Sequence, residues 1–222
     1  MITLNDVHKR YWTSRGEPHW VLRGISYTFP ADRKVAIIGA NGAGKSTLIR
    51  LIAGIDVPTR GEITRRCRVS WPIGLTGGLL PALSGRQNAR FVCRMHGHEE
   101  DLRERVEFVH EFSELGAEFD EPVKTYSSGM RSRLNFSLSL AFRFQVYLVD
   151  EMMSAGDASF REKARKAFED LAQSSDMVLV SHNNATVRTF CTEVIWLHEG
   201  QIRQFDDVEE AIRVYTKHIV RS

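Results

Sequence analysis

One segment constrains the fold of this chain more than any other feature: Gly39-Ala-Asn-Gly-Ala-Gly-Lys-Ser-Thr47. It matches the pattern G-x-x-x-x-G-K-[ST], in which a glycine-rich loop binds phosphate groups. The segment directly follows an apolar run at residues 35–38, and helical spacing continues over residues 47–53. A strand, a loop and a helix in this order are the context that the pattern requires. The sequence therefore predicts a nucleotide-phosphate site.

Each part of this loop has a predicted role. The glycines let the backbone turn so that successive N–H groups point at the β-phosphate, and the following helix adds its positive N-terminal end. We expect Lys45 to reach the β and γ oxygens as a catalytic residue, Ser46 to bind Mg²⁺, and Thr47 to support the α-phosphate side. The predicted nucleotide-binding residues of the loop are Gly39, Ala40, Asn41, Gly42, Ala43, Gly44, Lys45, Ser46 and Thr47.

A second apolar run, at residues 146–149, ends in two adjacent acids, Asp150 and Glu151. Metal-assisted hydrolysis of a phosphate needs one carboxylate that fixes Mg²⁺ and another that polarises the attacking water. We assign Asp150 to the metal, through water and together with Ser46, and Glu151 to the role of general base. The alternative is a pair of solvated acids at a strand end.

The apolar pattern predicts two kinds of β-structure. Alternating apolar residues within positions 1–30 indicate antiparallel strands, with a loop over residues 12–19. Solid apolar runs at 35–38, 146–149 and 177–180 indicate parallel strands that are covered on both faces.

The rest of the chain is predicted to be mainly helical. Ser84 and Gln87 form a capping box within a helical insert that we expect over about residues 75–140. A strand pair on either side of Gly200 and a helix over residues 207–218 follow towards the C-terminus. The fold class is therefore α/β.

Composition excludes several classes of protein. Lys and Arg total 30 against 28 Asp and Glu, a net charge of +2, which gives no broad basic surface for a nucleic-acid backbone. No apolar run approaches the roughly 20 residues of a membrane span, and the N-terminus lacks the apolar core of a signal peptide. We therefore expect the chain to stay in the cytosol. Its three cysteines include no CxxC pair, which predicts neither a disulfide framework nor a zinc site.

Further segments decide between the classes of phosphate-loop protein. Tyr126-Ser-Ser-Gly-Met130 resembles the signature motif of ABC ATPases, and His182, after the third solid run, resembles their switch histidine. Residues 154–157 resemble the D-loop of that family. The resemblance implies a P-loop NTPase of the ABC type, with a mostly parallel core sheet, an antiparallel β subdomain and a helical subdomain. Residues 1–222 would then be a single nucleotide-binding domain.

The signature motif implies a second anion site. A serine–glycine turn at a helix N-terminus, here before a helix expected over residues 130–142, binds anions. In ABC ATPases this turn serves the γ-phosphate of the opposite subunit, so that ATP joins a head-to-tail homodimer. The resemblance assigns this role to Ser127, Ser128 and Gly129. The alternatives are that Ser127 only caps its helix and that His182 is a plain surface or core histidine.

The resemblance also assigns Tyr11 as the aromatic side chain that stacks on adenine. An aromatic ring on a loop beside a nucleotide is a suitable stacking platform. Trp12 and Trp20 are the competing candidates. The ligands implied by the whole motif set are ATP and Mg²⁺.

Residues 71–90 and 124–134 narrow the resemblance to the ATPase subunits of group 2 capsular-polysaccharide exporters. O-antigen and teichoic-acid exporters are the near alternatives, although several of them carry a C-terminal extension. The resemblance implies two copies of this chain beneath two copies of an integral-membrane permease, peripheral to the cytoplasmic face of the inner membrane. It also implies periplasmic and outer-membrane export partners. A soluble ABC ATPase and a P-loop kinase are the distant alternatives.

The loop at residues 71–78 departs from the common ABC pattern. No glutamine lies within residues 71–85, where one usually links Mg²⁺ to the membrane partner. Its apolar side chains and glycines suit a partner, so we expect the loop and the helical insert to receive a cytoplasmic helix of the membrane subunit. Ile73 and Leu75 would then tolerate a charged substitution without loss of fold. The alternative is that Trp71 fills the core.

Overall fold

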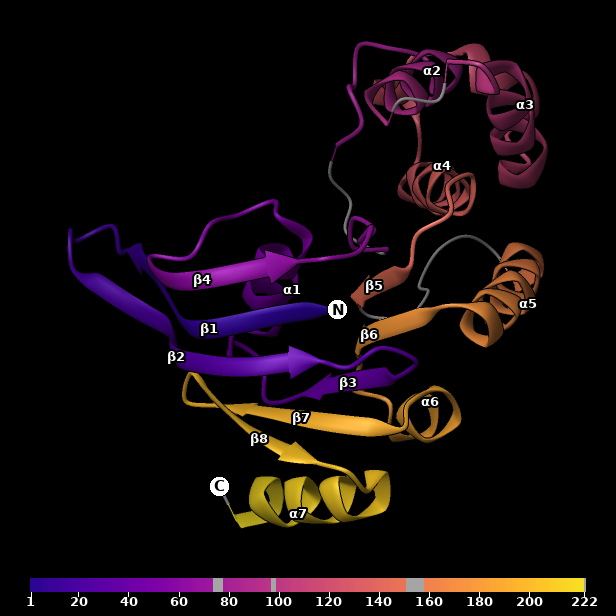
Figure 1. Ribbon diagram of the computed structural model, residues 1–222. Coiled ribbons are helices and arrows are strands. Elements are labelled where there is room, and N and C mark those ends of the chain that lie inside the picture. The colour runs from indigo at the N-terminus through magenta and orange to yellow at the C-terminus, as the bar shows by residue number, and fades with distance from the viewer. Residues whose placement is uncertain (74–77, 97–98, 151–157, 222) are drawn as a thin grey trace. The chain divides into compact units, whose positions relative to one another are not determined.

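The computed structural model describes residues 1–73, 78–96, 99–150 and 158–221 (Figure 1). The chain divides into two compact units. The first unit comprises Met1–Pro72, Phe144–Met152 and Ala172–Ser222, and the second comprises Ile73–Arg143 and Met153–Leu171. That residues 1–222 act as a single nucleotide-binding domain stays a prediction.

The first unit contains an antiparallel sheet. Its strands are β1 (Ile2–Trp12), β2 (Pro18–Phe29) and β4 (Arg60–Arg65), in the order β2-β1-β4. The loop predicted over residues 12–19 is shorter in the structure, because Trp12 pairs with Pro18 at the end of the ladder. The sequence pattern did not predict β4, because RGEITR holds one large apolar residue, Ile63, and no alternation.

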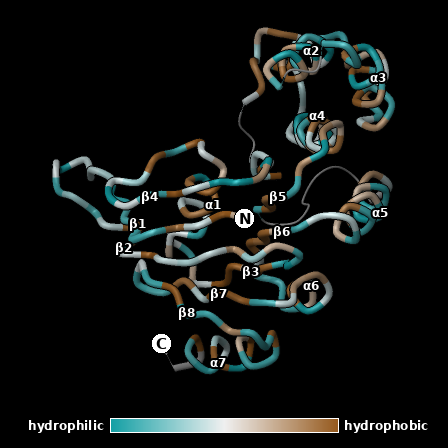
Figure 2. Tube along the Cα trace, viewed as in Figure 1, coloured by the Kyte–Doolittle hydropathy of each residue, from teal (hydrophilic) through white to brown (hydrophobic). Residues whose placement is uncertain are grey.

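The solid apolar runs form a second sheet in this unit, as predicted. Its five strands lie in the order β5-β6-β3-β7-β8. They are β5 (Val146–Asp150), β6 (Asp176–Val180), β3 (Lys34–Ile38), β7 (Glu193–His198) and β8 (Gln201–Phe205). The first four run parallel, and β8 is antiparallel to β7. Successive residues along β3 and β6 are buried, and Figure 2 shows these strands in the brown of hydrophobic residues. Burial of both faces explains why these runs are continuous rather than alternating.

The helices of the first unit are α1 (Lys45–Ala53), α6 (Asn184–Phe190) and α7 (Val208–Arg221). Four apolar residues of α1 belong to one hydrophobic core with residues of both sheets: Leu48, Ile49, Leu51 and Ile52. This shared core fixes the helix that follows the phosphate loop. Within the part of the chain that the structure describes, no helix is both long enough and apolar enough to cross a membrane.

The second unit is helical. Its elements are α2 (Gly85–Met95), α3 (Leu102–Ser113), the 3₁₀ helices η1 (Gly116–Asp120) and η2 (Val123–Thr125), α4 (Ser128–Leu140), and α5 (Ala158–Ser174) as far as Leu171. The predicted capping box is confirmed: the Ser84 hydroxyl accepts a hydrogen bond from the Gln87 N–H at 3.1 Å, and Gln87 Oε1 accepts one from the Ser84 N–H at 2.9 Å. The start of α2 is thereby fixed by its own sequence.

Candidate functional site

Three predicted site segments meet at one edge of the parallel sheet. The strand register sets Ile37 beside Val180, and Val180 beside Asp150. These strands therefore end together, and their carboxyl edge carries the loop from Gly39, Asp150 itself and His182, two residues beyond β6. Ligands of open α/β sheets bind at this edge.

The loop between β3 and α1 has a backbone that requires glycine. The φ angles of Gly39, Gly42 and Gly44 are +156°, +78° and +104°, values that L side chains rarely adopt. A β-carbon on Gly39 would lie 2.4 Å from the carbonyl oxygen of Leu197, and one on Gly44 would lie 2.8 Å from Cγ1 of Val21. The loop can therefore pass this close to β7 and β2 only where a side chain is absent.

Lys45 lies across this loop. Its side chain is 7% exposed, and its Nζ donates hydrogen bonds to the carbonyl oxygens of Gly39 at 2.8 Å and Ala40 at 2.9 Å. The ammonium group is thus held against the loop backbone instead of extending into solvent. An anion bound at the loop would meet a positioned positive charge, which strengthens the hydrogen bonds it can accept.

The N-terminus of α1 is open. Its N-cap is Gly44, which offers no side-chain hydrogen bond, and its first turn contains no acid. The first N–H groups of the helix and its dipole therefore favour an anion. Ser46 is exposed in this turn. A close-packed glycine backbone, a held cation and an uncapped helix end together fit the phosphate chain of a nucleotide.

The predicted metal ligands and catalytic residues lie at the same edge as far as they are described. The hydroxyl of Ser46 and the half-buried carboxylate of Asp150 are oxygen ligands of the kind that Mg²⁺ prefers. The donor atoms of these two residues therefore fit a magnesium ion. His182 is exposed. Glu151 and residues 154–157 lie outside the described residues, so their roles stay predictions.

Tyr11 lies beside α1. Its Oη donates a hydrogen bond at 2.8 Å to Oδ2 of Asp56, in the loop that follows α1. Burial, and then the bond to Asp56, raises the pKa of the Tyr11 hydroxyl. The side chain is 39% exposed, so a base can still reach the ring.

The two competing tryptophans face away from this position. The guanidinium of Arg10 lies 4.9 Å from the ring centre of Trp12 and 5.4 Å from that of Trp20. Side chains alternate along a strand, so Arg10 and both tryptophans lie on the face of the sheet opposite to Tyr11. This placement favours Tyr11 over Trp12 and Trp20 as the ring beside the phosphate loop.

Sequence reasoning missed two residues that contact Tyr11, namely Lys9 and Asp56. Strand alternation places Lys9 on the same face of β1 as Tyr11, and that signal was available from the sequence. Asp56 is 45 residues away from Tyr11, and no local pattern connects them. The contact exists because the loop after α1 folds back to the end of β1.

The signature residues lie at the start of α4, in the second unit. Ser127 is the N-cap, and its Oγ accepts a hydrogen bond from the Met130 N–H at 3.2 Å. Ser127 and Ser128 are exposed and Gly129 is half-buried. The capping role considered for Ser127 is therefore present. A hollow of about 370 Å³ lined in part by Ser127 and Gly129 lies at this helix end.

The structure of the segment after β4 differs in part from the docking loop that we expected over residues 71–78. Trp71 is half-buried and packs edge-on against Phe144, with ring centres 5.3 Å apart. Ile73 is 4% exposed, so the expectation that it tolerates a charge is wrong, because a buried charge without a partner is strongly unfavourable. Leu75 lies outside the described residues. The sequence could not reveal the packing of Trp71, because Phe144 lies far along the chain.

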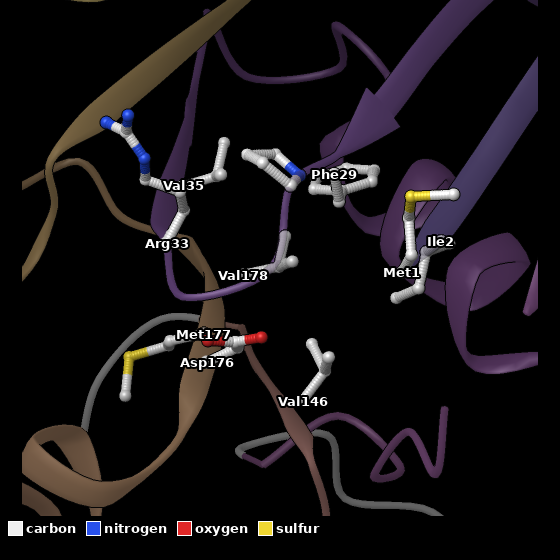
Figure 3. Close-up of a pocket in the computed structure, with 10 residues that line it drawn as sticks. Met1, Ile2, Phe29, Arg33, Val35, Val146, Asp176, Met177 and Val178 are labelled. Carbon is white, nitrogen blue, oxygen red and sulfur yellow. The ribbon is translucent and has the colours of Figure 1, made fainter. Parts of the chain in front are cut away.

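A small cavity lies at the opposite ends of the strands (Figure 3). Its volume is about 10 Å³, room for about one water molecule. Val35, Val146 and Asp176 line it, at or near the amino ends of β3, β5 and β6. The nucleotide-phosphate loop lies beyond the carboxyl ends, so this cavity is a feature of core packing and not part of the site.

The fold and the phosphate loop define the class of protein. The structure is similar to the dimeric ATP-binding cassette MJ0796 in a post-hydrolysis state bound to ADP and Pi, with a TM-score of 0.75 at 22% identity over 93% of this chain and 98% of that chain. This similarity confirms the predicted fold class. The family model for ABC transporters matches residues 22–154, and the chain belongs to this family.

Two relatives place the chain within the family more closely. It is 46% identical over 220 residues to the polysialic acid transport ATP-binding protein KpsT of Escherichia coli, covering 99% of this chain and 100% of that protein. It is 42% identical over 217 residues to the capsule polysaccharide export ATP-binding protein CtrD of Neisseria meningitidis serogroup B, covering 97% and 98%. The resemblance to capsular-polysaccharide exporter subunits is confirmed.

Proposed function

We propose that this chain is the ATP-hydrolysing subunit of a transporter that exports lipid-linked capsular polysaccharide across the inner membrane. The observation that carries the proposal is the loop from Gly39 to Gly44, with Lys45 held across it and the open end of α1 beyond it. Similarity over nearly the whole length of relatives named for polysialic acid transport and capsule polysaccharide export supports the choice of cargo.

The residues of the first unit divide the binding of MgATP between them. Backbone N–H groups of the loop and of α1 bind the β-phosphate, and Lys45 binds the β and γ oxygens. Ser46 and Asp150 would hold Mg²⁺, which when bound neutralises charge on the β- and γ-phosphates. Tyr11 stacks on the adenine.

Glu151 acts as the general base. It accepts a proton from the water that attacks the γ-phosphorus while the bond to the leaving oxygen of ADP breaks. His182, at the same sheet edge, binds the γ-phosphate side of the site. The position of Asp150 at the end of β5 supports this assignment, because Glu151 is the next residue along the chain.

Two copies of the chain bind ATP between them. Ser127, Ser128 and Gly129 of one subunit bind the γ-phosphate of the nucleotide held by the other, which makes each site composite. The exposure of Ser127 and Ser128 at the N-terminus of a helix of 13 residues supports this role. The likeness to a dimeric ATP-binding cassette is consistent with it.

Two copies of an integral-membrane permease bind this dimer at the cytoplasmic face of the inner membrane. The exposed apolar side chains of Leu80, Phe91 and Met95 support a docking surface for a cytoplasmic helix of the permease. Phe91 and Met95 are four residues apart on α2, so they share one side of that helix. These residues take the place of Ile73 in the expected docking surface. Periplasmic and outer-membrane partners complete the export path.

Replacing the general base tests the proposal. Glu151→Gln should bind ATP as tightly as the wild type and lose roughly 10²- to 10⁴-fold in turnover, the usual contribution of a positioned general base. Cells that carry this variant should lose surface capsule. Glu162→Gln, an exposed acid of α5 paired with Arg165, is the matched control and should turn over ATP normally. Turnover of Glu151→Gln close to that of the control would reject the assignment.

A further inference from the structure

The loop that follows α1 is hydrogen-bonded to the end of β1. The Thr59 N–H donates to the carbonyl oxygen of His8 at 2.7 Å, and the Thr59 hydroxyl accepts from the Arg10 N–H at 3.1 Å. The same loop folds back onto its own helix, because the Asp56 N–H donates to the carbonyl oxygen of Arg50 at 3.3 Å. Helix α1 and the last residues of β1 are therefore joined by this loop.

Asp56 is the centre of the connection. Its Oδ1 accepts hydrogen bonds from Lys9 Nζ at 2.6 Å and from the Val57 N–H at 2.8 Å. Its Oδ2 accepts the hydrogen bond from the Tyr11 hydroxyl at 2.8 Å. Each carboxylate oxygen is thus occupied by a residue of β1, and the direction of the bond to Tyr11 is set because an ionised carboxylate can only accept.

Lys9 also contacts the ring of Tyr11. Its ammonium nitrogen lies 5.0 Å from the ring centre, over one face, and donates to the carbonyl oxygen of Val57 at 2.8 Å. Lys9 is buried, so this cation does not leave the ring for solvent. Partial burial acts to raise the pKa of Asp56, but hydrogen bonds from Lys9, Tyr11 and Val57 outweigh it and hold that pKa below its usual value. The cluster is therefore a partly buried ion pair whose carboxylate also accepts a hydrogen bond from a phenol.

We propose that Asp56 and Lys9 are positioning residues for nucleotide binding, which hold the ring of Tyr11 so that its uncovered face receives the base. The ammonium of Lys9 covers one ring face, and the hydrogen bond that the Tyr11 hydroxyl donates to Asp56 fixes the hydroxyl end. The inference rests on the proposed role of Tyr11 as the adenine platform. Because the bonds come from the loop of α1, the ring is located relative to the same helix whose first turn binds the phosphates.

The test separates binding of the base from binding of the phosphates. Calorimetry with the full chain measures the affinity for MgADP, which has a base, and for magnesium pyrophosphate, which has none. Asp56→Ala and Lys9→Met should lower the affinity for MgADP by about threefold to tenfold, which corresponds to the loss of one hydrogen bond. The affinity of both variants for magnesium pyrophosphate should stay within about twofold of the wild-type value. Asp56→Asn keeps the shape of the side chain, and its affinity for MgADP should lie between those of the wild type and Asp56→Ala. Glu62→Gln, an exposed acid on β4, is the control and should bind both ligands normally.

A double-mutant cycle tests whether Asp56 acts through Tyr11. Tyr11→Ala should lower the affinity for MgADP by about 5- to 150-fold, the range for stacking of a base on an aromatic ring, and leave the affinity for pyrophosphate unchanged. Adding Asp56→Ala to Tyr11→Ala should then cause no further loss, because coupled residues are not additive.

Each contrary outcome has a separate meaning. Normal MgADP affinity in Tyr11→Ala would reject the adenine platform, and the positioning role with it. If Tyr11→Ala weakens MgADP but Asp56→Ala and Lys9→Met do not, the platform stands and the positioning role is overturned. Asp56→Ala and Lys9→Met could lower the affinity for pyrophosphate as much as that for MgADP, or the losses in the double variant could be fully additive. Either result would mean that the cluster supports the fold of α1, and would also overturn the proposal.

Discussion

Two helices of this chain begin at glycine- or serine-containing turns, and their N-termini differ. α1 begins after Gly44, which provides no side-chain cap, whereas α4 begins after Ser127, whose hydroxyl accepts the Met130 N–H. Neither helix has an acid in its first turn, but Glu114 and Glu118 line the hollow at the α4 end. Only α1, of these two helices, also has a lysine, Lys45, bonded to the loop before it.

The difference indicates two ways of binding a phosphate. At α1 the loop, the lysine and the uncapped N–H groups are all in place within one segment, so an anion can bind there without further groups. At α4 the serine satisfies part of the helix end, and Arg133, a cation that lines the hollow there, lies 3.7 Å from the carboxylate of Glu114. We therefore expect α1 to bind nucleotide within one chain, and α4 to bind a phosphate that another chain already holds.

The largest expected effect is on ATP binding, which should depend on the N-terminus of α1 and not on that of α4. Lys45→Ala should abolish ATP binding, because the positioned cation at the loop is lost. Ser127→Ala, the matched change at α4, should bind ATP in the monomer as the wild type does. Equilibrium binding of a fluorescent ATP analogue measures both variants. Equal losses of ATP affinity in the two variants would contradict the proposed difference between the N-termini of α1 and α4.

The next effect concerns association of two chains. The Glu151→Gln chain should be monomeric without ATP and dimeric with MgATP, because hydrolysis no longer separates the subunits. Adding Ser127→Arg should keep it monomeric with ATP bound, because the longer side chain blocks the second anion site. Size-exclusion chromatography with and without MgATP measures the change. A profile that does not respond to ATP would contradict the composite site.

The smallest effect is on the stability of α4. Ser127→Ala should lower the free energy of unfolding by about 1 kcal/mol, since the cap on the Met130 N–H is lost. Ser127→Asp should retain most of that stability, because its carboxylate can accept the same bond. Urea denaturation followed by circular dichroism measures these differences. No change in Ser127→Ala would mean that the cap does not stabilise the helix.

Local features allowed much of the architecture to be predicted. The apolar runs that became β3, β5 and β6, the capping box before α2 and the glycine-rich loop before α1 each depend on residues that are close in sequence. Their structures follow from strand burial, helix capping and backbone sterics, which act over a few residues. The carboxyl edge could also be anticipated, because the parallel strands that end at Ile38 and Asp150 must share it.

The sequence by itself determined the phosphate loop, the place of Asp150 at the end of β5 and the class of fold. Only the tertiary structure decided that Tyr11, rather than Trp12 or Trp20, faces α1, and that Asp56 holds it from 45 residues away. It also decided the burial of Ile73 and added β4, whose residues carry no strand pattern. The physical reason is the range of the interactions. Backbone sterics and capping are local, whereas the face that a ring presents and the burial of a loop depend on chain segments that meet only after folding.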